Sequence, residues 1–230
     1  MNAVLLSAGY SERLRPLTDN IPKCLLPATS KGNLLQYWVD LLIDVGIEKI
    51  WIVTCWKKEE IRRFVNRQCL YTRNMVRLYE EEALEPSGQA LYNLSRYLGD
   101  RCLIVNTDTF ITKTGVVDLL KTDSKVFPIH LGVSFEEDVR EGSLVSVWEG
   151  VVVSFTEKPK EKTAGYSYAG ILTIDNKVTN IKSESYGNIT PDIVEKYVGN
   201  MSICDVGEIV DIGRRVEGYY EAIEKIRRME

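Results

Sequence analysis

Short apolar runs alternate with amphipathic stretches through the first half of the chain. Ala3-Val4-Leu5-Leu6 is a continuous apolar run that stops at Ser7-Ala8-Gly9, which predicts a strand buried on both faces. Asn33 precedes apolar residues spaced by three and four positions, and Gly46 closes this stripe, so we predict a helix between them. The alternation continues with strands predicted at Lys49–Thr54, Met75–Tyr79 and Cys102–Asn106, and helices predicted at Lys57–Gln68 and Gln89–Leu98. This order favours a largely parallel sheet covered by helices, with its ligand at the carboxyl ends of the strands.

The pattern changes after about Ile111. Strands are predicted at Val126–Val133, Ser143–Val147, Val151–Phe155 and Tyr168–Ile174, with a hairpin turn at Glu149-Gly150. A short helix is predicted at Ile189–Val198 and a terminal amphipathic helix at Arg214–Arg228. The simplest arrangement is one compact unit whose C-terminal half is more antiparallel than its N-terminal half.

Composition narrows the class of protein. Hydrophobic residues at 44% and charged residues at 27% are ordinary globular values. The 29 basic and 33 acidic residues give a formal charge of −4, so nothing in the bulk charge favours binding to nucleic acid or to a membrane surface. The five cysteines are scattered without a CxxC pair, which favours free thiols in a reducing compartment. With no signal peptide pattern and no apolar run long enough to cross a bilayer, we expect a cytoplasmic protein.

Several other residues are predicted to be structural. His130 lies in an apolar strand pattern, and a buried structural histidine is more common there than a catalytic one. The tryptophans occupy apolar positions and are predicted to pack in the core: Trp38, Trp51, Trp56 and Trp148.

The loop after the first predicted strand has the residues of a phosphate site. The small residues Ser7-Ala8-Gly9 let backbone N–H groups approach a ligand closely. Arg13 and Lys23 add positive charge that suits polyphosphate oxygens. The loop has neither GxxxxGK[ST] nor GxGxxG, so it is neither a P-loop nor a dinucleotide-binding turn. On composition alone, such a loop is more often a surface turn.

The longer string LLSAGYSERLRPLTDNIPKCLLP resembles the signature of the sugar-1-phosphate nucleotidyltransferases. That signature has the form L-x-A-G-x-G-x-R-L-x-P-L-T, followed after a short spacer by P-K-x-L-L-P. The family uses this loop for the triphosphate, so the resemblance implies that Arg13 and Lys23 contact phosphate oxygens as catalytic residues. It also implies that the nucleotide is bound by loop residues Leu6, Ala8, Gly9 and Ser11, where Ser11 replaces the second glycine of the signature.

Two aspartates stand in strings that resemble metal-binding motifs of the family. Asp108 follows a predicted strand and matches the aspartate of V-L-N-G-D-T, with Thr107 in place of glycine. Asp211 matches the aspartate of D-I-G-T, with Arg214 in place of threonine. The resemblance implies that Asp108 and Asp211 hold Mg²⁺, an ion for which one or two carboxylates plus substrate phosphates suffice. The structural alternative for Asp108 is a turn or a helix cap, and that for Asp211 is a cap of the terminal helix.

The string EPSGQAL resembles the family's small-residue turn that touches the nucleotide base. The resemblance assigns Ser87 and Gly88 to nucleotide binding. A helix N-terminus with Ser87 as its cap is a structural alternative that is compatible with this role.

Two further strings resemble the sugar-phosphate site of the family. Glu157 and Lys158 match the E-K-P motif, in which Glu accepts hydrogen bonds from sugar hydroxyls and Lys neutralises the sugar phosphate. The string YAGI resembles the N-A-G-I strand that lies against the sugar, so the resemblance places Tyr168 and Gly170 there as well.

Because the resemblance spans nearly the whole chain, it implies an α/β fold of Rossmann-like, three-layer α/β/α type, with a mixed, mostly parallel sheet and a small antiparallel C-terminal part. It implies one domain, 1–230, with a nucleotide-binding half at 1–110 and a sugar-phosphate-binding half at 111–230. The implied activity is Mg²⁺-dependent transfer of a nucleoside monophosphate from a nucleoside triphosphate (NTP) to a sugar 1-phosphate, giving a nucleoside-diphosphate sugar and pyrophosphate.

Two alternatives stay open. Phosphocholine cytidylyltransferases share this fold and loop. A non-catalytic regulatory relative that binds nucleotide sugars would account for the departures at Ser11, Thr107, Tyr168 and Arg214. The sequence does not specify the base, the sugar or the oligomeric state, and it leaves a homo-oligomer open.

Overall fold

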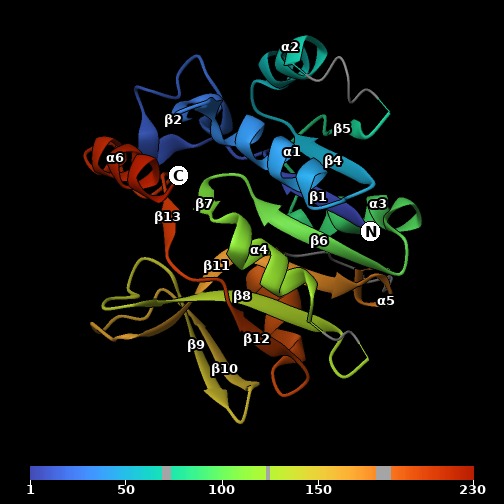
Figure 1. Ribbon diagram of the computed structural model, residues 1–230, viewed down its shortest axis with the longest axis vertical. Helices are drawn as coiled ribbons and strands as arrows, with labels where there is room; N and C mark the ends of the chain where they lie inside the picture. The colour runs from blue at the N-terminus through green and yellow to red at the C-terminus, as the bar shows by residue number, and fades with distance from the viewer. Residues whose placement is uncertain (69–73, 123–124, 180–187) are drawn as a thin grey trace. The chain divides into compact units, whose positions relative to one another are not determined.

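The computed structural model describes residues 1–68, 74–122, 125–179 and 188–230 (Figure 1). The chain divides into two compact units. Unit 1 comprises Met1–Leu84, Val105–Phe110 and Val210–Glu230, and unit 2 comprises Glu85–Ile104 and Ile111–Ile209. The C-terminal segment therefore belongs with the N-terminal part of the chain. The single domain with halves at 1–110 and 111–230 stays a prediction.

Unit 1 is built on three parallel strands in the order β5–β4–β1. Their bounds are β1 Asn2–Leu6, β4 Lys49–Thr54 and β5 Val76–Glu80. Its other elements are η1 Glu12–Leu14, η2 Lys23–Leu25, β2 Pro27–Thr29, β3 Gly32–Asn33, α1 Leu34–Asp44, α2 Lys58–Gln68 and α6 Tyr219–Met229. Ile50 pairs with Ala3 on one side and with Val76 on the other, and all three are buried. The parallel arrangement predicted for this part of the chain is confirmed.

Helix α1 begins and packs as its sequence predicts. The side chain of Asn33 accepts a hydrogen bond from the Gln36 N–H at 2.9 Å, which caps the helix N-terminus. Trp38 is fully buried, and its indole N–H donates to the Thr109 carbonyl oxygen at 2.9 Å. Within the described ranges, no helix has the length and apolar character needed to cross a bilayer.

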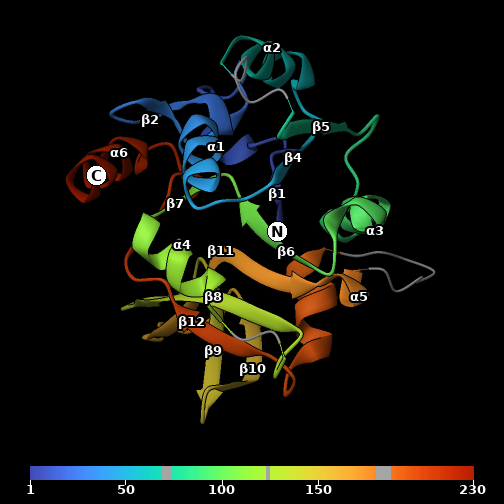
Figure 2. The same ribbon diagram turned by 45° about the vertical axis from the view of Figure 1, so that its right-hand side comes forward.

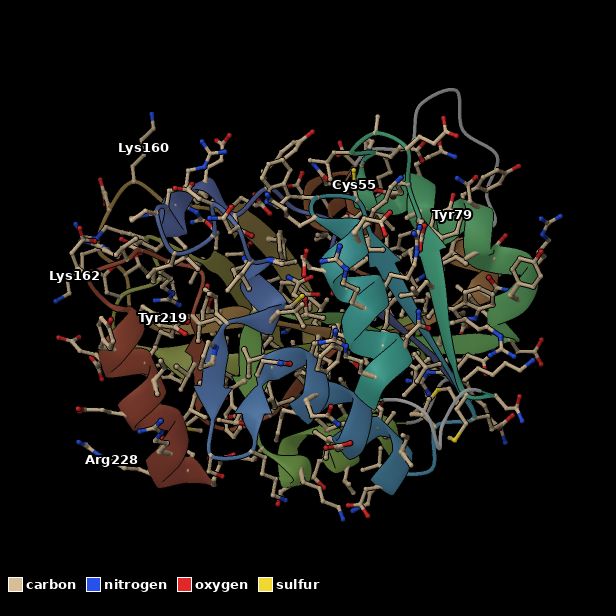
Figure 3. All side chains as sticks on the ribbon, turned by 90° about the horizontal axis from the view of Figure 1, so that it is seen from above. Cys55, Tyr79, Lys160, Lys162, Tyr219 and Arg228 are labelled. Carbon is tan, nitrogen blue, oxygen red and sulfur yellow. The ribbon has the colours of Figure 1, made fainter. Side chains whose placement is uncertain are left out.

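Helix α6 begins at Tyr219, so the prediction that it begins at Arg214 is wrong. The residues before it form turns that end at Gly218, and the side chain of Arg214 pairs with Asp211 instead of lying along a helix. The Tyr219 hydroxyl donates to the Pro27 carbonyl oxygen, which fixes α6 against β2. Figure 3 shows Tyr219 at the inner side of α6 and Arg228 pointing outward.

Unit 2 contains a mixed sheet. Its strands are β8 Ile129–Glu136, β9 Ser143–Trp148, β10 Val151–Glu157, β11 Gly165–Asp175 and β12 Ser202–Asp205. Strand β8 pairs parallel with β12 and antiparallel with β11, and β10 pairs antiparallel with β12 and β9. Strand β9 also pairs antiparallel with β11, so the pairings of the five strands close into a ring.

The helices of unit 2 are α3 Ser87–Leu98, α4 Lys113–Leu120, α5 Asn176–Thr179, η4 Ile189–Val194 and η5 Glu195–Tyr197. In Figure 2, α4 lies along β8 and β12. Three strands contain residues of both units: β6 Arg101–Asn106, β7 Thr109–Ile111 and β13 Ile209–Asp211. Strands β7 and β13 pair as a separate two-stranded sheet.

Two sequence predictions in unit 2 are wrong. Strand β8 begins at Ile129 and not at Val126, because Pro128 has no N–H to add to the ladder. Trp148 is 70% exposed and is not a core residue, because it is the last residue before a tight hairpin turn. That turn is confirmed, since Glu149 and Gly150 both have positive φ (49° and 81°).

Gly115 in α4 packs against the backbone of unit 2. A Cβ at this position would lie 2.2 Å from the Val206 carbonyl oxygen, and the backbone cannot yield as a side-chain end does. We expect Gly115→Ala to lower the free energy of unfolding by roughly 1–3 kcal/mol, although alanine favours helices. Urea unfolding measures this, with Thr114→Ala as the exposed neighbour whose effect stays within about 0.5 kcal/mol. Unchanged stability of Gly115→Ala would contradict the close approach.

Candidate active site

Backbone pairing brings the two aspartates of the sequence analysis together in unit 1. Asp108 follows β6, and Asp211 is the last residue of β13. The Ile212 N–H donates to the Asp108 carbonyl oxygen at 3.0 Å, directly beyond the pairing of β7 with β13. Segments that are distant in the sequence are therefore held next to each other by hydrogen bonds.

Three charged atoms surround the position that a Cβ on Gly213 would occupy. The Lys23 Nζ forms an ion pair with Asp108 Oδ2. A Cβ on Gly213 would lie 2.8 Å from Lys23 Nζ and 3.0 Å from each of Asp108 Oδ2 and Asp211 Oδ1. The two carboxylate oxygens are therefore separated by at most about twice that distance. Of the predicted site residues, Lys23, Asp108 and Asp211 are brought into one cluster.

Asp211 is oriented by contacts at both of its oxygens. The Gly213 N–H donates to Oδ1 at 2.6 Å, and Arg214 Nε lies 3.7 Å from Oδ2. We call Lys23, Asp108, Asp211 and Arg214 the carboxylate cluster. Its side chains are between 20% and 33% exposed, so the cluster is shielded but open to solvent.

The charges of the cluster perturb one another. Burial alone would lower the pKa of Lys23, but the charges of Asp108 and Asp211 raise it above its ordinary value. Burial opposes ionisation of Asp108, yet the neighbouring Lys23 holds the pKa of that carboxyl below its usual range. Burial and then the charge of Asp108 raise the pKa of Asp211 to about 6. Two carboxylates this close are an environment that favours a cation.

The predicted phosphate loop contains a left-handed turn at Ser11. Its φ is 57°, a conformation that favours glycine, and its hydroxyl donates to the Gly9 carbonyl oxygen at 3.3 Å. The Thr18 hydroxyl donates to the Ser11 carbonyl oxygen at 2.8 Å and holds the far side of the loop. Arg13 is exposed in η1, has no ion pair among the described residues, and its charge helps to lower the pKa of Asp108.

Thr107, which replaces a glycine of the family motif, joins two strand ends. Its hydroxyl donates to the Leu6 carbonyl oxygen at 2.8 Å and lies 3.0 Å from the Ser7 hydroxyl. The Ala8 carbonyl oxygen accepts from the Trp56 N–H at 3.3 Å. The contacts of Thr107 fix the start of the phosphate loop to the residue that precedes Asp108, and the Trp56 contact fixes Ala8 to the segment after β4. Sequence reasoning did not find this role, because the motif has no side chain at this position.

The predicted base-contacting residues lie in the first turn of α3 in unit 2. Pro86 and not Ser87 occupies the N-cap position, so the structural alternative in which Ser87 caps the helix does not hold. The Ser87 hydroxyl instead accepts a hydrogen bond from the Ile189 N–H at 3.0 Å. Gly88 is buried.

Glu157 and Lys158 lie at the end of β10 in unit 2. Both are exposed. Lys158 has a positive φ of 46°, and its N–H donates to the Gly142 carbonyl oxygen at 2.8 Å. This contact fixes the backbone of Lys158, while its side chain forms no ion pair with a described residue. In Figure 3, Lys160 and Lys162 point outward from the loop that follows.

Tyr168 and Gly170 lie in an irregular stretch of β11. The register with β8 shifts between Tyr168 and Leu172, and Gly170 has a φ of 74°. A left-handed residue in a strand marks a bulge and requires glycine. The Tyr168 ring meets Phe155 of β10 edge to face, with ring centroids 6.4 Å apart. These residues and the carboxylate cluster belong to different units.

The chemistry of the cluster fits a divalent cation with a preference for oxygen. Mg²⁺ takes one or two carboxylates and completes its shell with water and substrate phosphates. In the part of the chain that the structure describes, no group of three or more His, Cys, Asp or Glu residues is placed to hold a metal. Among the described residues, Asp108 and Asp211 form a close carboxylate pair of the kind that such an ion accepts together with substrate phosphates.

Comparisons with known proteins identify the family to which the chain is similar. Residues 2–228 match the family model described as nucleotidyl transferase. A bifunctional protein GlmU of Methanocaldococcus jannaschii is 28% identical over 184 residues, 77% of this chain and 41% of the relative. The UTP–glucose-1-phosphate uridylyltransferase AglF of Haloferax volcanii is 27% identical over 176 residues, 75% of this chain and 71% of the relative.

A solved structure extends the likeness over the whole chain. The crystal structure of a putative glucose-1-phosphate thymidylyltransferase from Bacillus anthracis has a TM-score of 0.84 at 22% identity, covering 100% of this chain and 96% of that one. At this identity the likeness shows the fold, and the predicted α/β class with a mixed sheet is confirmed. The chain spans about half the length, 41–52%, of the GlmU relatives that it matches.

Proposed function

The chain belongs to the nucleotidyl transferase family, and we propose that it transfers a nucleoside monophosphate from an NTP to a sugar 1-phosphate. The products are a nucleoside-diphosphate sugar and pyrophosphate. The convergence of Lys23, Asp108 and Asp211 beside Gly213 carries this proposal. The names of two similar proteins, a uridylyltransferase and a putative thymidylyltransferase of glucose 1-phosphate, support a sugar 1-phosphate as the acceptor.

The proposed reaction is an in-line displacement at the α-phosphorus. An oxygen of the sugar phosphate forms the new bond, and the bond to the bridging oxygen breaks, so that pyrophosphate leaves with its electron pair. The attacking oxygen is already anionic, so no general base is needed. Catalysis then consists of alignment and charge neutralisation. We assign Arg13 and Lys23 to the triphosphate and Lys158 to the sugar phosphate.

Asp108 and Asp211 would hold Mg²⁺. When bound there, the ion supplies positive charge that neutralises the phosphate oxygens. Lys23 holds the Asp108 carboxylate in place by their ion pair, and the Gly213 N–H holds Asp211. Both carboxylates are thereby oriented by this chain before any ligand arrives.

The remaining site residues are proposed with the roles that the resemblance gives them. Nucleotide binding is assigned to Leu6, Ala8, Gly9, Ser11, Ser87 and Gly88. Sugar-phosphate binding is assigned to Glu157, Lys158, Tyr168 and Gly170. We further propose the Rossmann-like three-layer arrangement for the fold and a cytoplasmic location.

The cluster also favours an enzyme over a regulatory relative that only binds nucleotide sugars. Burial and the nearby charge of Asp108 raise the pKa of Asp211, and such a carboxylate pair is unfavourable without a function, whereas a binding module needs only to neutralise phosphate. The two departures at Ser11 and Thr107 have structural roles in this chain: Ser11 adopts a left-handed turn, and the Thr107 hydroxyl donates to the Leu6 carbonyl oxygen.

A pyrophosphate-release screen tests the proposal. Each NTP is combined with hexose, heptose and amino-sugar 1-phosphates, and with phosphocholine, in the presence of Mg²⁺. We expect turnover with one or a few sugar 1-phosphates. Turnover with phosphocholine alone would establish the cytidylyltransferase alternative, and no turnover with any pair would favour the regulatory one.

Lys158→Gln tests the sugar-phosphate assignment. Loss of one cation that contacts the acceptor phosphate is expected to raise KM for the sugar 1-phosphate roughly tenfold or more, with KM for the NTP changed less than about twofold. Initial rates with each substrate varied in turn separate the two constants. Lys160→Gln is the control, because this exposed lysine lies on the same loop. Equal effects on both KM values, or equal effects of the two variants, would contradict the assignment.

A further inference from the structure

Arg214 pairs with Asp211 through a different carboxylate oxygen from the one that lies nearest to Gly213. Its Nε lies 3.7 Å from Asp211 Oδ2, whereas Oδ1 accepts from the Gly213 N–H and faces the point shared with Asp108 and Lys23. The two oxygens of Asp211 thus have different neighbours. Arg214 is one-third exposed, so its charge is only partly screened by water.

Arg214 changes the charge balance of the cluster. Asp108 and Asp211 carry two negative charges when ionised, and Lys23 and Arg214 carry two positive ones. Arg13 also acts on the cluster through its charge, but it forms no ion pair with either carboxylate. Of the cations that pair directly with the two carboxylates, only Lys23 would be left without Arg214. A divalent ion that arrives alone therefore enters a site that is already neutralised and has to compete with Arg214 for Asp211. An ion that arrives with a triphosphate brings anionic oxygens, which offset the guanidinium charge.

We propose that Arg214 is a positioning residue that holds Asp211 and makes the carboxylate cluster a weak site for a free divalent ion, so that the ion is taken up together with the triphosphate. This inference rests on the proposed function, because it takes Asp108 and Asp211 as the metal ligands. It adds a role for Arg214, to which the proposed function assigns none.

Binding of Mn²⁺ without nucleotide tests the proposal. Free Mn²⁺ is measured by electron paramagnetic resonance in titrations of the full chain and of the Arg214→Gln, Arg214→Thr and Arg214→Lys variants. Removing a cation that pairs with a ligand carboxylate is expected to tighten Mn²⁺ binding roughly threefold to tenfold in the two neutral variants. Arg214→Lys keeps the charge and is expected to stay within about twofold of the parent chain.

Arg215→Gln is the matched control, since it removes the same charge from the next residue, which is exposed. Unchanged affinity in both neutral Arg214 variants, or the same gain in Arg215→Gln, would overturn the proposal. Circular dichroism and thermal unfolding accompany each titration. If both neutral variants fail to fold, the pair with Asp211 is a structural ion pair and the proposal is likewise overturned.

Variants of the aspartates separate this inference from the proposed function. Asp108→Asn and Asp211→Asn are expected to abolish measurable Mn²⁺ binding at the cluster. If they bind Mn²⁺ as the parent chain does, the metal site itself is wrong. If they lose binding while the neutral Arg214 variants equal the parent chain, the metal site stands and only the role of Arg214 fails.

Discussion

Asp108→Asn is expected to lower kcat/KM roughly 10³-fold, because it removes a ligand of the ion that neutralises the phosphates. Asn keeps the shape of the side chain and an oxygen that accepts a hydrogen bond from Lys23. The chain is therefore expected to fold, with a loss of unfolding free energy of about 1–2 kcal/mol for the missing ion pair. Pyrophosphate release at saturating Mg²⁺, with the substrates found in the screen, measures the effect.

The control for this variant is Asp118→Asn, which changes an exposed aspartate that pairs with Lys121 on the surface of α4. Its kcat/KM is expected to stay within about twofold of the parent chain. Asp211→Asn is expected to resemble Asp108→Asn, because both residues serve the same ion. Near-normal Mg²⁺-dependent turnover by Asp108→Asn would refute the metal assignment.

The regular elements of unit 1 were predictable because local pattern decides them. Strand β1 is a short apolar run, and α1 has an apolar stripe with a capping residue, Asn33, at its start. Pairing with neighbours only strengthens what these segments already favour. In unit 2, β12 and α4 were not predicted. Strand β12 is short and only partly buried, and α4 begins with Lys113-Thr114-Gly115, in which the glycine disfavours a helix.

Some of the wrong predictions depend on contacts that residue type alone does not reveal. The apolar stripe that predicts α6 extends back to Val216. The helix itself begins only after Gly218, because the residues from Ile212 to Gly218 form turns and Arg214 pairs with Asp211. Ser87 has the residue type of a helix cap, but its hydroxyl accepts from Ile189, a residue distant in the sequence. For Ser87, nothing near it in the sequence indicates this partner.

The candidate site was also predictable only in part. The resemblance supplied Lys23, Asp108 and Asp211, and the structure brings these three together. It gave no role to Thr107 or Arg214, because at those positions the motif has residues without the same chemistry. Their functions follow from contacts with Leu6 and Asp211 that only coordinates show.

Gly213→Ala is expected to lower kcat/KM roughly 10²-fold with a change of less than about 1 kcal/mol in the free energy of unfolding. The added Cβ would lie 2.8 Å from Lys23 Nζ and 3.0 Å from Asp108 Oδ2 and Asp211 Oδ1. These atoms are the ends of flexible side chains, so they move aside at little cost to folding. They are also the proposed functional atoms, so the same small movement disrupts catalysis.

The control is Gly218→Ala, at the N-cap of α6, where a Cβ would meet its nearest atoms at 3.9 Å. Its activity is expected to match that of the parent chain. Steady-state kinetics and urea unfolding on both variants separate activity from stability. If Gly213→Ala lost stability and activity in proportion, the glycine would serve the fold. If it kept full activity, the point beside Gly213 would not be where the phosphate chemistry takes place, because alanine fills that point directly.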